Sequence, residues 1–251
     1  MEKDKGRAIT VTSGKGGTGK TTTVAAIAAH LASLGHKTLC IDCDIGLKNL
    51  DIALGMNNLN SADFIDCAQG RLTLGQAAVH HPRIVNLDFL SAPTKMIKAE
   101  NVDTDKMRMF IDRVKDEYEY CIIDSPAGLG DGFRLAACGA DMAIIVATCD
   151  PSSMRDGQMV SAELNDMGVT NIRLLVNRVK PKLYKKMRAT VDGIIDSVGA
   201  RLIGLVAEDE NVILAANSGT PLMFYESKRA SAQYLRIAKR IAGEKIPLGK
   251  I

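Results

Sequence analysis

The stretch Gly14-Lys15-Gly16-Gly17-Thr18-Gly19-Lys20-Thr21 decides the fold class, because it fits the phosphate-loop pattern G-x-x-x-x-G-K-[ST]. A run rich in β-branched residues precedes it over residues 8–12, and an apolar pattern at helical spacing follows over residues 21–34. Glycines let backbone N–H groups approach phosphate oxygens, and the start of a helix adds free donors and the positive end of a dipole. We therefore predict a nucleoside triphosphate site at this loop.

Two side chains of the loop have roles that its chemistry predicts. Lys20 is expected to reach the β- and γ-phosphates, and the hydroxyl of Thr21 is expected to bind Mg²⁺. Lys15 is a second lysine inside the variable part of the pattern. Two interpretations of it are equally good on the residues alone: a solvated surface lysine, or a cation that points toward a facing subunit as an arginine finger does.

Length and composition limit the class of protein. The chain has 251 residues, a size that suits one large domain over residues 1–251. Its net charge of +3 and its 4% aromatic residues give no indication of a nucleic-acid partner. The first residues lack an apolar signal segment, no apolar run is long enough to cross a bilayer, and scattered cysteines fit a reducing compartment, so we expect a cytoplasmic protein. Cys40 and Cys43 form a C-x-x-C, but we interpret both as buried small apolar residues rather than a redox or metal pair.

Short β-rich runs alternate with helical patterns along the whole chain. Most of the runs are continuously apolar, as expected for strands that are covered on both faces. The alternation predicts an α/β fold with a doubly wound, mostly parallel sheet, whose ligands bind at the carboxyl ends of the strands. The predicted strands are residues 8–12, 37–42, 87–90, 120–124, 142–147, 172–177 and 202–206, and the predicted helices are residues 21–34, 103–118, 152–167, 183–198 and 228–242.

Acidic residues follow two of these strands. Asp124 ends the Tyr120-to-Ile123 run, where phosphate-loop proteins hold Mg²⁺, usually through water. Asp42 and Asp44 end another strand, and either could orient the attacking water or support the metal. The structural alternative for all three is a capping or turn aspartate. Asn177 also ends a strand, and its amide suits either a purine edge or a turn.

The chain resembles the deviant phosphate-loop ATPases of the MinD/ParA class, and the MinD branch most closely. The loop pattern K-G-G-x-G-K-T-T is matched from Lys15 to Thr22, D-x-D-I-G-L-x-N-L-D from Asp42 to Asp51, and D-S-P-A-G from Asp124 to Gly128. Further similarity lies at residues 139–141, 155–156, 177–181 and 208–210, so the resemblance extends from the first strand to about Ile246.

This resemblance implies a P-loop NTPase of the deviant Walker A (SIMIBI) type that forms an ATP-bound homodimer with the nucleotides at the interface. It implies that Lys15 reaches across the dimer, that Asp44 activates or positions water, and that Asp42 and Asp124 support the magnesium site beside Thr21. It further implies a division-inhibitor partner, a partner that stimulates slow ATP hydrolysis, peripheral contact with the inner face of the cell membrane, and a role in placing the division septum. The nucleotide-binding residues that it implies are Gly14, Lys15, Gly16, Gly17, Thr18, Gly19, Lys20, Thr21, Thr22, Asn177, Arg178, Glu208 and Asp209.

Three departures from the family pattern stand out. Ala207 replaces a usual proline before the Glu-Asp pair, and residues 148–151 replace an N-P-E type sequence. Residues 243–251 contain Pro247 and are too short for the family's amphipathic tail helix. The preceding helix has several basic residues and an apolar stripe formed by Ala230, Tyr234, Ile237 and Ile241. This layout suits either an interfacial helix or one docked on the core. We expect the docked helix, and with it only weak membrane contact.

Other members of the class give alternative functions. DNA-segregation ATPases usually show P-Q after the D-x-D, where this chain has Ile45-Gly46. Metal-cofactor maturation ATPases and iron–sulfur relatives carry paired cysteines, whereas Cys138 lies fourteen positions past Asp124 and no C-x-C occurs. Flagellar-number regulators usually have an N-terminal extension, but only a few residues precede the first strand here.

Overall fold

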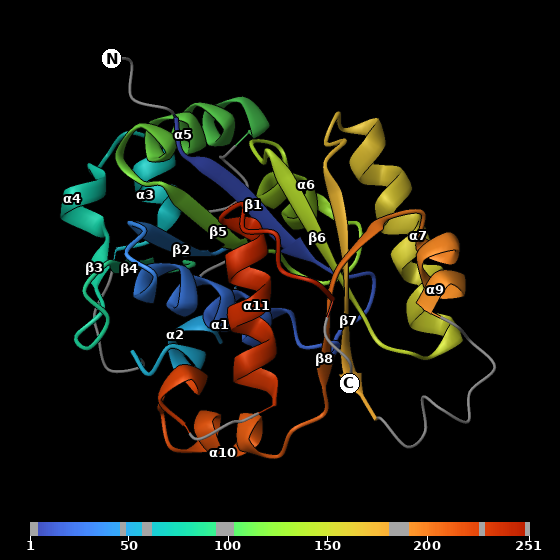
Figure 1. The fold of residues 1–251 in the computed structure, drawn as a ribbon. Helices are drawn as coiled ribbons and strands as arrows, with labels where there is room; N and C mark the ends of the chain where they lie inside the picture. Colours follow the sequence, from blue (N-terminus) through green and yellow to red (C-terminus); the bar gives the residue numbers. More distant parts are fainter. Residues whose placement is uncertain are drawn as a thin grey trace.

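A computed structural model describes residues 5–45, 49–56, 62–93, 103–180, 191–225 and 229–248. Its centre is an eight-stranded sheet of order β3-β4-β2-β5-β1-β6-β7-β8 (Figure 1). All neighbouring pairs are parallel except β3 with β4, so the predicted doubly wound, mostly parallel sheet is confirmed. The strands are β1 (Arg7–Thr12), β2 (Thr38–Asp42), β3 (Val79–His80), β4 (Leu87–Leu90), β5 (Tyr120–Asp124), β6 (Met142–Ala147), β7 (Ile172–Val179) and β8 (Arg201–Ala207).

Helices cover both faces of this sheet, which explains why its central strands are apolar throughout. The strands β2 and β5 are buried at every position, and their alternate side chains enter different clusters. On β2, Cys40 packs on the face of α1, whereas Leu39 and Ile41 pack on the face of α5. The helices are α1 (Lys20–Ser33), α2 (Leu50–Ala53), α3 (Phe64–Ala68), α4 (Leu74–Ala77), α5 (Thr104–Glu117), α6 (Asp131–Ala137), α7 (Pro151–Asp166), α9 (Val191–Val198), α10 (Asn211–Asn217), the 3₁₀ helix η2 (Leu222–Phe224) and α11 (Ala230–Ile241).

The last helix, α11, is docked on the core, as we expected. It runs beside α1 on one face of the sheet (Figure 1). Tyr234, Ile237 and Ile241 are at most 2% exposed and belong to the same cluster as the apolar residues of α1. The guanidinium of Arg240 donates hydrogen bonds to the carbonyl oxygens of Ile203 and Ile246, which ties the following segment to β8. The apolar stripe of α11 is therefore occupied within the protein.

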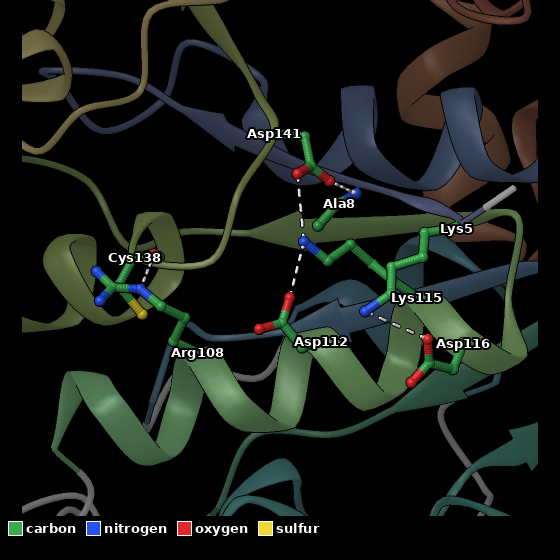
Figure 2. Close-up of polar contacts among 8 residues, drawn as sticks. All are labelled: Lys5, Ala8, Arg108, Asp112, Lys115, Asp116, Cys138 and Asp141. Atoms are coloured by element: carbon green, nitrogen blue, oxygen red, sulfur yellow. Dashed lines mark hydrogen bonds and ion pairs between the residues drawn. The ribbon is translucent and has the colours of Figure 1, made fainter.

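An ion pair network fixes where β6 begins relative to β1 and α5 (Figure 2). The carboxylate of Asp141 accepts a hydrogen bond from the backbone N–H of Ala8 at 2.8 Å. It also forms an ion pair with the ammonium of Lys115 at 3.2 Å. Lys115 also contacts Asp112 at 3.0 Å, and its side chain is only 12% exposed. These acceptors outweigh burial and raise the pKa of Lys115. The start of β1, at the end of this strand opposite the phosphate loop, is thus held by charged groups as well as by apolar packing.

Several elements differ from the predictions. The strand β3, the short helices α2, α3, α4, α6 and α10, and the 3₁₀ helix η2 were not predicted, because two to seven residues carry too little periodicity. The strands β7 and β8 extend beyond the predicted ends at 177 and 202–206. Residues 183–190 of the predicted helix 183–198 lie outside the described residues, as do Gly46, Pro181 and Lys228.

The six cysteines are all free. Cys40 and Cys43 are buried and lie in clusters on opposite faces of the sheet, which confirms that they pack as small apolar residues. Among the described residues, no helix combines the length and the apolar character needed to span a membrane.

Candidate functional site

The predicted phosphate loop connects β1 to α1 and depends on glycine at particular positions. Gly17 and Gly19 have φ angles of 80° and 94°, which glycine adopts without strain. A Cβ atom on Gly19 would also lie 2.3 Å from Nδ2 of Asn177, and one on Gly14 would lie 2.5 Å from Cβ of Asp156. The loop is therefore packed against β7 on one side and α7 on the other, so its shape is set by the fold.

The backbone of the loop presents free donors at the start of α1. Gly19 is the N-cap residue, and no side chain caps the helix in the described part of the chain. The first N–H groups of α1 are therefore left for a ligand, and the helix dipole favours an anion there. Lys15, Gly16 and Gly17 are exposed, whereas Thr18 and Lys20 are 3% and 8% exposed. This geometry is suited to an anion, and the predicted phosphate contacts stay a prediction.

Asp42 and Asp124 lie opposite each other at the carboxyl ends of β2 and β5. The carboxylate of Asp42 accepts hydrogen bonds from the backbone N–H groups of Asp44, at 2.9 Å, and Leu50, at 3.3 Å. Burial raises the pKa of Asp42 to about 6. Burial and the nearby charge of Asp42 raise the pKa of Asp124 to about 7, against the hydrogen bond with Thr21 and the charge of Lys20. The carboxyl ends of β2 and β5 therefore hold two carboxyl groups whose pKa values are raised, mainly by burial.

Lys20 faces these acidic groups from the loop. Burial lowers its pKa, while the charges of Asp124 and Asp44 act in the opposite direction. Asp44 is partly buried, and its pKa is raised by burial and lowered by Lys20. The structure thus brings together four predicted residues, Lys20, Asp42, Asp44 and Asp124, and places Thr21 in contact with the last of them.

The residues present fit Mg²⁺, which was predicted at Thr21, Asp42 and Asp124. One carboxylate oxygen of Asp124, Oδ1, is buried and has no hydrogen-bond partner among the described residues. A buried oxygen of this kind together with the Thr21 hydroxyl is a hard-oxygen donor set, which Mg²⁺ prefers. Both oxygens of Asp42 already accept backbone hydrogen bonds, so Asp42 holds the backbone at Asp44 and Leu50 in place.

Lys15 lies at the mouth of the loop. Its Nζ donates a hydrogen bond to Oγ of Ser152, at 3.2 Å, at the start of α7. It borders a pocket of about 510 Å³ that extends from the loop toward β7. The lining residues are Lys15, Gly16, Gly17, Thr18, Thr148, Cys149, Asp150, Pro151, Arg178 and Lys180. We predicted that Lys15 reaches across a dimer, and a single chain does not test this role.

Asn177 and Arg178 end β7 beside the loop. The amide Nδ2 of Asn177 is buried and donates a hydrogen bond to the carbonyl oxygen of Thr18 at 2.9 Å, so this residue supports the loop. Its predicted contact with adenine stays a prediction. Arg178 has a φ of 52°, the one positive value at a non-glycine position in the described chain, and its exposed side chain borders the pocket.

Glu208 and Asp209, which were predicted to bind nucleotide, follow β8. Glu208 forms an ion pair with Lys180 at 3.1 Å. The carboxylate of Asp209 accepts hydrogen bonds from the backbone N–H groups of Asn211 and Ala230, at 3.0 and 3.2 Å, and so connects the starts of α10 and α11. In the structure both residues contact other residues of the chain, and their predicted contact with nucleotide stays a prediction.

Two residues that support the phosphate loop were not predicted from the sequence, Thr23 and Tyr234. The hydroxyl of Thr23 donates to the carbonyl oxygen of Gly19 at 2.8 Å, and it lies 3.1 Å from the hydroxyl of Tyr234. Thr23 was indistinguishable from other helical threonines, and Tyr234 was interpreted only as part of an apolar stripe. A tyrosine in a stripe of aliphatic residues is the one signal that pointed to a buried polar partner.

Comparisons with known proteins agree with this geometry. The family model of the AAA domain matches residues 6–176. The septum site-determining protein MinD of Bacillus subtilis is 38% identical over 245 residues, which cover 97% of this chain and 91% of that protein. In a MinC:MinD cell division protein complex from Aquifex aeolicus, the matching chain has a TM-score of 0.89 and 37% identity, with 97% of this chain and 98% of that chain covered.

A third neighbour bears on the ligand. MinD of Pyrococcus horikoshii, solved with Mg-ADP, has a TM-score of 0.82 and 28% identity, with 96% of this chain and 99% of that chain covered. The match to these proteins extends over nearly the whole chain. This chain therefore belongs to the MinD family of septum site-determining proteins.

Proposed function

We propose that this chain is an ATPase of MinD type that dimerises when it binds ATP and takes part in placing the division septum. The relatives that match nearly the whole chain are septum site-determining proteins, and a neighbouring structure holds Mg-ADP. The observation that carries the proposal is the group formed by Lys20, Thr21 and Asp124 beneath a glycine loop with free helix N–H donors. This arrangement suits the phosphates of a nucleotide and a hard divalent cation.

Each residue of the site has a part in the proposed reaction. The loop N–H groups and Lys20 hold the phosphates and offset their negative charge. Thr21 and Asp124 would hold Mg²⁺, which would offset further phosphate charge when bound. Asp44, which has a raised pKa, orients water for attack and takes up its proton, and Asp42 fixes the backbone of Asp44 through a hydrogen bond of 2.9 Å.

The dimer is the second half of the proposal. Lys15 is exposed at the mouth of the loop, and glycine at positions 16 and 17 lets another backbone approach closely. In the ATP-bound state, Lys15 leaves Ser152 and contacts the nucleotide of the second copy. Binding of the γ-phosphate then closes the dimer, and its loss opens it. Slow hydrolysis, accelerated by a partner protein, times the two states.

Sizing of the protein with ATP and Mg²⁺ tests this proposal, and Asp44→Ala is the informative variant. We expect the wild-type chain to hydrolyse ATP and the variant to lose about 10²-fold or more in rate. Because ATP persists in its site, the variant stays dimeric. Asp105→Ala, on the exposed face of α5, is the control and behaves as wild type. A variant that stays monomeric in saturating ATP and Mg²⁺ contradicts the proposal.

The proposed partners follow from the family. A division inhibitor is proposed because the neighbour from A. aeolicus was solved as a MinC:MinD complex. Membrane contact is proposed to be weak, because the apolar stripe of α11 is buried and Arg240 is engaged with backbone carbonyls. Sedimentation with anionic liposomes in ATP and in ADP measures this contact. Strong sedimentation in both nucleotides contradicts a weak, ATP-dependent interaction.

A further inference from the structure

The hydroxyl of Tyr234 contacts Thr23, a residue bonded to the phosphate loop, although Tyr234 belongs to the last helix. Tyr234 is 1% exposed and is the largest of the fully buried side chains in the described chain. Its ring packs in the apolar cluster between α11 and α1, its hydroxyl lies 3.1 Å from the hydroxyl of Thr23, and the side chain of Asn177 acts to lower the pKa of Tyr234. These two partners come from different elements, α1 and β7. One side chain therefore joins three elements.

Each of the two partners holds a carbonyl group of the loop. Asn177 donates to the carbonyl oxygen of Thr18 at 2.9 Å, and Thr23 donates to the carbonyl oxygen of Gly19 at 2.8 Å. The backbone N–H of Thr23 also donates to Gly19, at 3.0 Å. These are consecutive carbonyls, and they come directly before Lys20. The network therefore acts on the part of the loop that faces the phosphates.

Peptide geometry turns this anchoring into an orientation of donors. In a trans peptide the C=O and the following N–H point in opposite directions. When the carbonyl of Thr18 is held by Asn177, the N–H of Gly19 points away from β7. When the carbonyl of Gly19 is held by Thr23, the N–H of Lys20 has its direction fixed in the same way. The anchored carbonyls thus preorganise two N–H groups for an anion.

We infer that Tyr234 is a positioning residue for the phosphate loop: it holds Thr23 and Asn177 in place, and through them it couples the docking of α11 to the shape of the loop. The inference rests on the proposed function in that the ligand used to detect it is ATP. It adds that α11 is linked to nucleotide binding. By reciprocity, a nucleotide that needs the ordered loop also strengthens the docking of α11.

The variant Tyr234→Phe in the full chain tests this role, since it keeps the ring and removes only the hydroxyl. We expect ATP and ADP to bind about threefold to tenfold more weakly, the size expected for one lost buried hydrogen bond. KM for ATP rises by a similar factor, whereas kcat changes little, because no reacting atom is touched. Ser231→Ala is the matched control. It removes a hydrogen bond of 3.2 Å between Ser231 and His30, which joins the same two helices away from the loop.

The control separates positioning from general stability. Both variants are expected to lower the melting temperature, but only Tyr234→Phe weakens nucleotide binding and speeds exchange of the Thr23 amide, which donates to the carbonyl oxygen of Gly19. Equal ATP affinity in Tyr234→Phe and wild type overturns the inference. If the wild-type chain binds no ATP, the proposed function fails instead, and the two failures are distinct.

A measurement on the wild-type chain keeps the test usable if Tyr234→Phe does not fold. Hydrogen exchange of the α11 amides is compared without nucleotide and with saturating ATP and Mg²⁺. We expect slower exchange in the turn of α11 that contains Tyr234, although this helix packs on α1 and β8 rather than on the loop. Exchange in α11 that does not respond to nucleotide overturns the inference.

Discussion

Asp42 and Asp124 face each other across adjacent parallel strands, and burial raises the pKa of both, to about 6 and about 7. A site that gathers buried carboxyl groups is costly to the empty protein and favourable once a cation is bound. The raised pKa values therefore connect the stability of the empty chain to its readiness for a ligand.

Stability of the empty protein should fall as pH rises. Asp42 and Asp124 hold protons more tightly in the folded chain than in the unfolded chain, so the folded state binds more protons between about pH 4 and pH 7. Their favourable contribution is complete below the unfolded pKa and is lost as pH rises through the folded pKa. We expect Asp124→Asn to raise the free energy of unfolding at pH 8 by about 1–3 kcal/mol.

Urea unfolding at several pH values without nucleotide measures this effect. Asp105→Asn is a suitable control, because its carboxylate is 85% exposed. The slope of stability against pH should flatten in Asp124→Asn and not in the control. An Asp124→Asn protein that is less stable than wild type at pH 8 contradicts the expectation.

Gly19 should not tolerate a side chain. Its φ of 94° is unfavourable for alanine, and the new Cβ would overlap Nδ2 of Asn177 at 2.3 Å. We expect Gly19→Ala to lose about 1–3 kcal/mol of stability and at least tenfold in ATP affinity, because the carbonyl anchor at Thr18 is displaced. Calorimetric titration with ATP measures the affinity.

Gly35 provides the comparison for Gly19. It has a similar φ of 98°, but a Cβ there meets nothing within 4 Å. Gly35→Ala should cost about 1 kcal/mol of stability and leave ATP affinity unchanged. Equal ATP binding by the two variants would mean that the approach of Asn177 has no effect on the loop.

Lys15 should matter to the dimer and not to the fold. It is exposed, and its ammonium donates a hydrogen bond to Oγ of Ser152. Lys15→Ala is expected to have the melting temperature of wild type but to remain monomeric in ATP and Mg²⁺ during analytical ultracentrifugation. Ser152→Ala, which removes the partner instead, should still dimerise. Dimer formation by Lys15→Ala would contradict the proposed contact across subunits.

Asp141 should contribute to stability alone. It holds the N–H of Ala8 and the mostly buried ammonium of Lys115 (Figure 2), at the end of β1 opposite the phosphate loop. We expect Asp141→Asn to lower the free energy of unfolding by about 1 kcal/mol, since the carboxylate is partly exposed and its charge is screened. Asp112→Asn, which leaves the contact with Ala8, should cost less. A change in ATPase rate in Asp141→Asn would show that this end of the sheet affects the site.

The sequence predicted most of the strands well, because predominantly apolar runs leave little choice. Residues 87–90, 120–124 and 142–147 form strands with the predicted bounds. The two-residue strand β3 and the four- and five-residue helices α2, α3 and α4 were missed, since tertiary contacts rather than periodicity decide segments of that length.

The site was predicted where a motif fixed the geometry and missed where distant segments meet. Lys20, Thr21, Asp42 and Asp124 come together as the loop and the strand ends implied. Asn177 was expected to suit a purine edge or a turn, and the structure shows its amide on the loop. The position of Tyr234 beside Thr23, 211 residues away in the sequence, depends on how α11 docks, which spacing along the chain does not encode.

The antiparallel strand β3 ends the sheet beside β4, and it contributes only two paired positions, Val79 with Phe89 and His80 with Asp88. A neighbouring chain that approaches this border finds too short a backbone template to add a further strand. The β3 side of the sheet therefore offers little support for fibril growth by strand addition.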